Sequence, residues 1–183
     1  MELFDASNGI TVFYAVSQVF ALASLVFDLV AMQRKRKPTL LNMDVMAAIC
    51  SFLHYAFLGA WAGMVSKAVT TARNGIAAYS SSKKIKTPKA LPLVFIVIYI
   101  VIGCFTFKSP LDILPILAPC IYTVVIYMCD ITKIRYTGVA TAVIWLIYDI
   151  CVFSIVGVVT KIILIINDSI AIYRFRKKGS KKT

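Results

Sequence analysis

The chain has 183 residues, of which 60% are hydrophobic, and its mean hydropathy is +0.85. This apolar content lies far outside the range of soluble globular domains and indicates a membrane protein. A membrane-spanning helix needs about 20 residues, so there is room for about seven crossings and no separate soluble domain. The net charge of +12 comes from short Lys and Arg clusters between apolar runs. Such clusters are typical of membrane topology signals, and we predict no nucleic-acid partner.

Basic and polar breaks divide the first half into apolar runs. Residues 9–32 form the first run, and the basic residues 34–37 with Pro38 end it. Acidic Glu2 and Asp5 precede this run, which predicts a retained helix and no signal peptide. Residues 39–78 would make about 60 Å of helix, twice the hydrocarbon core. This run must therefore fold back once, near residues 57–60.

The rest of the chain shows the same kind of division. Residues 80–89 form a polar linker with four lysines, and residues 90–107 form an uncharged crossing of minimal length. A short turn at residues 108–110 leads into residues 111–131, which contain Pro115 and Pro119. Residues 136–173 are nearly two crossings long and are expected to turn near residues 152–154. The helices are thus grouped three, one and three.

One segment occurs twice, at a spacing of 94 residues. Residues 63–79 match residues 157–173, and the matched pairs include Gly63 with Gly157 and Tyr79 with Tyr173. Internal repeats indicate a duplicated architecture. Three-helix units joined by one crossing must point the same way. We therefore predict an all-α membrane protein with seven transmembrane helices, arranged as two parallel three-helix repeats joined by a linker helix. The predicted parts are a first repeat (1–79), the linker and fourth helix (80–108), a second repeat (109–174) and a basic cytosolic tail (175–183).

The distribution of basic residues predicts the orientation. With the N-terminus outside and the C-terminus cytoplasmic, 17 of the 20 Lys and Arg fall in cytosolic segments, Arg73 among them. Lys108 is then outside, and Lys67 and Lys161 lie within the membrane.

Three stretches carry a resemblance to a known family. They are residues 53–61 (LHYAFLGAW) with 73–74, residues 109–115 (SPLDILP), and residues 172–175 (IYRF). They resemble the YgjV family of bacterial inner-membrane proteins, which is similar to the SWEET and PQ-loop (MtN3-like) superfamily. The resemblance implies a location in the bacterial inner membrane and seven helices. It also implies the movement of small solutes, with a substrate site between the repeats near mid-membrane.

The resemblance also implies positions for hinge and binding residues. The Pro-Gln hinge of the superfamily falls in the first helix of each half. Aligning Asp28 with Asp130 makes Gln18 and Pro119 the hinge candidates, so only the second half keeps the proline. Sugar carriers of the superfamily use asparagines from the last helix of each half, and the repeat places Asn74 and Asp168 there, with Asn167 beside them.

Polar residues inside the apolar runs supply the other site candidates. Lys67 and Lys161 are repeat mates near the middle of their helices, where a lysine costs roughly 2.5–3.5 kcal/mol on insertion scales. They either bind an anionic or carboxylate-bearing solute, or they snorkel or pair with Asp28, Asp130 or Asp149. Ser66 and Thr160 extend the same polar stripe, but small polar residues also join membrane helices.

His54 and Asp149 lie at approximately corresponding positions of the two halves. A histidine–carboxylate pair could relay protons, whereas a lone histidine is more often a packing and hydrogen-bonding residue. Gly63 and Gly157 are expected to permit close helix approach. The five cysteines lie in apolar runs without C-x-x-C spacing, so we expect them to pack as small hydrophobes.

These features favour a small-solute transporter with the lipid bilayer and a small molecule as its partners. The alternative is a non-transporting membrane scaffold or lipid-interacting protein, and a weaker one is a vitamin-precursor carrier of the PnuC type. A dry interface between the halves would favour the scaffold, and a cavity reaching Lys67 and Lys161 would favour the transporter. The sequence contains no phosphate loop, metal-ligand cluster or nucleophile–base spacing, so we predict no enzyme activity, no cofactor and no metal. It leaves open the substrate and whether the chains form a homo-oligomer.

Overall fold

The structure is a computed structural model, and it describes residues 7–85, 87–88, 90–107 and 109–179. In these ranges the regular elements are seven α-helices and one short 3-10 turn, without any strand. The helices are α1 (Ser7–Gln33), α2 (Lys37–Leu58), α3 (Trp61–Lys83), α4 (Leu91–Thr106), α5 (Leu114–Met128), α6 (Ile131–Cys151) and α7 (Ile155–Gly179), with the 3-10 turn η1 at Pro110–Ile113. The all-α class predicted from the sequence is confirmed.

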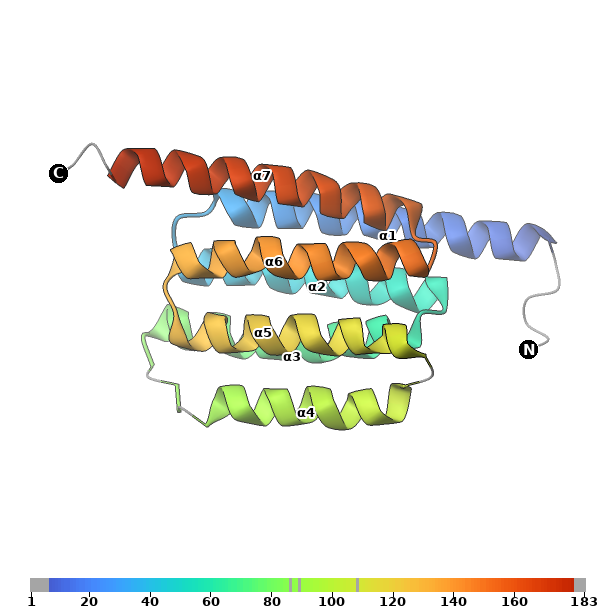
Figure 1. The fold of residues 1–183 in the computed structure, drawn as a ribbon, viewed down its shortest axis with the longest axis horizontal. Helices are drawn as coiled ribbons and strands as arrows, with labels where there is room; N and C mark the ends of the chain where they lie inside the picture. The colour runs from blue at the N-terminus through green and yellow to red at the C-terminus, as the bar shows by residue number, and fades with distance from the viewer. Residues whose placement is uncertain (1–6, 86, 89, 108, 180–183) are drawn as a thin grey trace.

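The helices lie side by side in two layers, with α4 at one edge (Figure 1). One layer contains α1, α2 and α3 in that order, and the other contains α7, α6 and α5. At the ends of the layers α1 packs against α7 and α3 against α5, while α4 packs against both α3 and α5. The middle helices α2 and α6 face each other across the centre of the bundle.

The two predicted reversals of the long runs are present. Gly59 ends α2 with φ 74°, a left-handed conformation that glycine adopts without steric cost. Its N–H bonds to the carbonyl of Ala56, and α3 begins at Trp61. In the second half Phe153 adopts φ 55° between α6 and α7. Both turns lie at the same end of the bundle (Figure 1).

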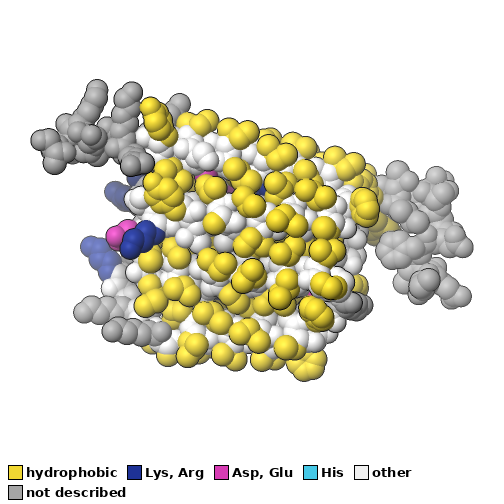
Figure 2. All heavy atoms as spheres, in the orientation of Figure 1, with side chains coloured by type: hydrophobic (Ala, Val, Ile, Leu, Met, Phe, Trp, Pro, Cys, Tyr) yellow, Lys and Arg dark blue, Asp and Glu magenta, His cyan; other side chains and the backbone are white. Residues whose placement is uncertain are grey.

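The outer surface of the bundle is apolar. Within the described residues, four segments are long and apolar enough to cross a membrane: Val12–Gln33, Lys37–Leu58, Pro110–Met128 and Thr132–Cys151. The helix α4 is apolar but shorter. Figure 2 shows hydrophobic side chains over most of the visible face, and Lys and Arg gathered at one end, where the α1–α2, α3–α4 and α5–α6 connections lie. The remaining two helices, α3 and α7, carry several buried polar side chains, and α1, α2 and α6 carry others.

Candidate functional site

A cavity of about 120 Å³ lies between the two layers. Every helix except α4 contributes to its wall. Six charged side chains line it, three cations and three carboxylates: Lys67, Arg73, Lys161, Asp28, Asp44 and Asp168. The cavity is therefore polar, although apolar side chains cover the outside of the bundle.

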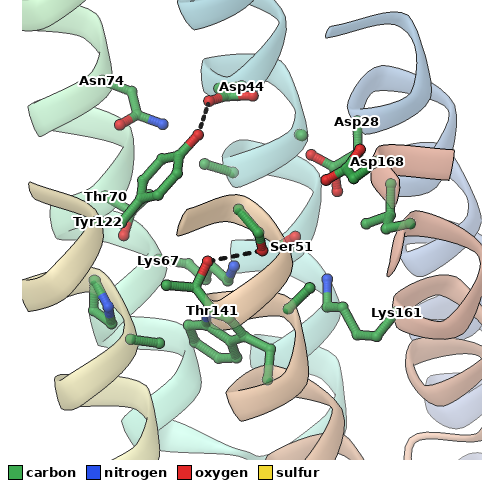
Figure 3. A pocket seen from close by; sticks show the side chains of 18 of the residues that line it. Asp28, Asp44, Ser51, Lys67, Thr70, Asn74, Tyr122, Thr141, Lys161 and Asp168 are labelled. Atoms are coloured by element: carbon green, nitrogen blue, oxygen red, sulfur yellow. Dashed lines mark hydrogen bonds between the residues drawn. The ribbon is translucent and has the colours of Figure 1, made fainter. Parts of the chain in front are cut away.

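The two repeat-mate lysines reach this one cavity from different helices. Lys67 on α3 places Nζ 3.9 Å from the ring centroid of Trp145, which lies on α6. A cation over an indole face is attracted by the ring quadrupole. Lys161 on α7 is 8% exposed, and its side chain extends into the cavity (Figure 3). Among the described residues, no hydrogen bond and no ion pair within 4.0 Å holds its ammonium group.

The carboxylates come from three helices. Asp28 on α1 interacts electrostatically with both lysines, and with Asp44 and Asp168. Asp44 on α2 accepts a hydrogen bond from Tyr122 Oη on α5 at 3.2 Å (Figure 3). Asp168 on α7 is 2% exposed, and its Oδ1 has no hydrogen-bond partner in the described part of the chain. The cavity thus contains polar atoms that protein groups leave unsatisfied.

Arg73 lies in a different place from the one predicted. The sequence analysis assigned it to a cytosolic segment, but it lies within α3 at 1% exposure and lines the cavity. Its guanidinium donates to neutral oxygens: Nε and Nη2 to Asn74 Oδ1 at 3.0 and 2.9 Å, and Nη1 to Pro119 O and Thr123 Oγ1, both at 2.9 Å. The reason is that α3 packs against α5, whose proline-containing backbone offers a buried carbonyl to the guanidinium.

The other predicted binding residues divide into two groups. Asn74 and Asp168 line the cavity together with the lysines, so four of the seven candidates converge. Ser66, Thr160 and Asn167 do not line it. Ser66 Oγ donates to the carbonyl of Pro115 at 2.5 Å. Thr160 Oγ1 is buried without a hydrogen-bond partner among the described residues, and Asn167 is half-buried.

The two hinge candidates have different surroundings. Pro119 is buried inside α5 and lines the cavity. Because it has no N–H, it leaves the carbonyl of Pro115 without an intrahelical donor, and Ser66 supplies one. Gln18 on α1 is away from the cavity, and its Oε1 accepts a hydrogen bond from the N–H of Val156 at 3.1 Å. It thus satisfies a free backbone donor in the first turn of α7.

His54 and Asp149 lie outside the cavity lining and have separate partners. His54 Nδ1 donates to Ser17 O at 2.8 Å, so in the neutral ring Nε2 accepts from Ser154 Oγ at 3.0 Å. Asp149 Oδ1 accepts from Tyr55 Oη at 2.7 Å, while its Oδ2 has no hydrogen-bond partner in the described part of the chain. The proton relay remains a prediction. The observed bonds connect α2 to α1, to α6 and to the α6–α7 turn.

Sequence reasoning missed several lining residues. Asp44 and Arg73 are charged side chains inside apolar runs, a pattern that by itself marks an internal polar site. Trp145 is 8% exposed and lines the cavity, whereas Trp61 is 61% exposed. For Tyr122, Ser51 and Thr141, which also line the cavity, the sequence carried no specific signal.

Membrane-length apolar helices, an apolar exterior and a charged internal cavity together define a multi-pass α-helical membrane protein. The chain matches the model of the Imp-YgjV family, described as bacterial inner membrane protein, over residues 15–179 and belongs to that family. No curated protein and no solved structure matches the chain. Its membrane is therefore the bacterial inner membrane.

Proposed function

We propose that this protein is a carrier, and not an enzyme, that moves small polar solutes across the bacterial inner membrane. The observation that carries the proposal is the central cavity, which reaches both Lys67 and Lys161. A membrane scaffold without a transport role would be expected to have a dry interface between the two layers. A charged cavity at that place supports the carrier instead.

The energetics of the two lysines point the same way. On insertion scales a lysine at the centre of a membrane helix costs roughly 2.5–3.5 kcal/mol. Lys67 is compensated in part by the Trp145 ring, and Lys161 has no ion pair within 4.0 Å among the described residues. Intramembrane ionisable groups that face a cavity commonly mark a solute pathway. We infer that a bound solute completes the coordination of these ammonium groups.

The proposed architecture is SWEET-like. All seven helices cross the membrane, with α1–α3 and α5–α7 as parallel repeats and α4 as the linker. Rotating one layer onto the other about an axis along the bundle would exchange α1 with α5 and α3 with α7 (Figure 1). The Tyr55–Asp149 hydrogen bond joins residues 94 positions apart, the spacing of the sequence repeat. Residues so related can touch only near a twofold axis, so this bond supports the repeat. Alternating access then consists of one repeat rocking against the other.

Solute uptake into liposomes tests the proposal. We expect purified full-length protein to carry at least one member of a broad panel of labelled small metabolites. Lys161→Met should lower that uptake at least about tenfold, because it removes an ammonium group from the cavity. Lys133→Met is the matched control, since Lys133 is exposed at the basic end of the bundle, and it should transport like the unmodified protein. Folded protein that carries no member of the panel would contradict the proposal.

A further inference from the structure

The charges of the cavity are separated along the bundle. Figure 3 shows Lys67 and Lys161 on one side of the cavity, and Asp28, Asp44 and Asp168 on the other. The helix directions explain this separation. Lys67 and Lys161 lie in the second turns of α3 and α7, whereas Asp28 lies late in α1 and Asp44 early in α2, at the basic end. The cavity therefore has an ammonium end with Lys67 and Lys161, and an opposite end where three carboxylates outnumber the guanidinium of Arg73.

One unsatisfied group is present at each end. Lys161 is 8% exposed, and Asp168 is 2% exposed with Oδ1 unpartnered among the described residues. Both lie on α7, seven residues apart, so they share a helix face at an axial separation of about 10 Å. Arg73 does not compete for this role, because Asn74, Pro119 and Thr123 accept hydrogen bonds from four of its five N–H groups. The Asp168 carboxylate also interacts with Asn167 and Arg135, but its Oδ1 stays unpartnered in the described part of the chain. The Lys161 ammonium group and Asp168 Oδ1 thus offer one donor and one acceptor to the same space.

We propose, building on the carrier function, that the solute is a small zwitterion with a carboxylate and an ammonium group on a short skeleton. Its carboxylate lies at Lys161 and Lys67, and its ammonium group at Asp168 and Asp28. A simple anion would satisfy the lysines but would be repelled by the aspartates. A simple cation would satisfy the aspartates but would be repelled by the lysines. A zwitterion places its carboxylate against the lysines and its ammonium group against the aspartates. Charge-assisted hydrogen bonds of this kind are stronger than neutral ones.

The size of the cavity limits the skeleton. A cavity of about 150 Å³ is known to hold benzene, which has six carbon atoms. The volume of about 120 Å³ here therefore admits about five or six non-hydrogen atoms. Glycine and β-alanine fall within this limit, whereas amino acids with long or aromatic side chains do not. Sugars are also too large for the cavity in this conformation.

Binding of matched solutes to the full-length protein in detergent tests the inference. Isothermal titration calorimetry with β-alanine, propionate and ethylamine compares a zwitterion with solutes that lack one of its charges. We expect β-alanine to bind at least about tenfold more tightly than either of the others. Propionate binding as tightly as β-alanine would identify an anion site and overturn the inference. The absence of β-alanine binding would overturn it as well.

Variants assign the two ends of the site. Lys161→Met and Asp168→Asn should each weaken β-alanine binding about tenfold or more. Lys133→Met and Asp130→Asn, at exposed positions, should leave it unchanged. If a cavity variant fails to fold, the solute series on the unmodified protein still decides the question. Flux of another solute without β-alanine binding would refute the zwitterion and keep the carrier. Binding of β-alanine without flux of any solute would refute the carrier and keep the zwitterion site.

Discussion

Arg73 is the largest fully buried side chain in the described part of the chain, and all its described hydrogen bonds go to neutral oxygens. Burying a charge is costly unless it is paired or hydrogen-bonded. Four hydrogen bonds meet that requirement here, and the rings of Tyr99 and Tyr122 lie 5.9 and 5.4 Å from its guanidinium carbon. Arg73 consequently connects α3 to the Pro119 region of α5, while the lysines remain turned to the cavity.

Ser66 gives a prediction at the scale of a single hydrogen bond. Its hydroxyl satisfies the Pro115 carbonyl that Pro119 leaves without a donor, so Ser66→Ala should lower the free energy of unfolding by about 1 kcal/mol. In a Pro119→Ala background the loss should be smaller, because alanine restores an N–H to the helix. Thermal or denaturant unfolding in detergent measures both values. An equal loss in the two backgrounds would contradict this account.

At the scale of elements, the helices α3 and α7 differ from the others in composition. Their polar faces hold the cavity lysines, Asn74 and Asp168. Their first turns approach neighbouring helices closely through Gly63 and Gly157, as expected from the repeat. A Cβ at Gly63 would lie 3.0 Å from the Tyr55 ring and 3.1 Å from the Tyr148 ring. The two glycines thus let the first turns of α3 and α7 pack closely against α2 and α6.

Gly157 therefore gives a prediction for α7. A Cβ there would clash with Ser154 Oγ and lie 2.9 Å from the Asp149 carboxyl group. Gly157→Ala should lower the free energy of unfolding by about 1–3 kcal/mol, the usual cost of overpacking. The control is Gly75→Ala on α3, where a Cβ meets no atom within 4 Å. That change should be neutral or stabilise by up to about 1 kcal/mol. Equal destabilisation by both substitutions would refute the close approach at Gly157.

At the scale of the whole molecule, the charge distribution gives a prediction for the orientation in the membrane. The α1–α2, α3–α4 and α5–α6 connections lie at one end of the bundle, where the Lys and Arg visible on the surface gather (Figures 1 and 2). From the positive-inside rule we predict that this end is cytoplasmic and that the α2–α3 and α6–α7 turns face outward.

Cysteine accessibility measures this orientation. In a chain whose five native cysteines are replaced, we expect Phe153→Cys to react with a membrane-impermeant maleimide in intact spheroplasts. Lys35→Cys should react only after the membrane is opened. Both positions are exposed, so the difference reports the side of the membrane. The reverse pattern would place the basic end outside.

The sequence alone determined the apolar class, the run of helices and the positions of the two tight turns, because these follow from chain length, hydropathy and local breakers. It also identified Lys67, Lys161, Asn74 and Asp168 through the repeat. Only the tertiary structure decided which polar groups meet. Lys67 faces Trp145, Arg73 enters the bundle, and Ser66 turns to Pro115. Such contacts depend on which helix faces which and on their relative rotation, and a hydropathy pattern along one chain does not encode either.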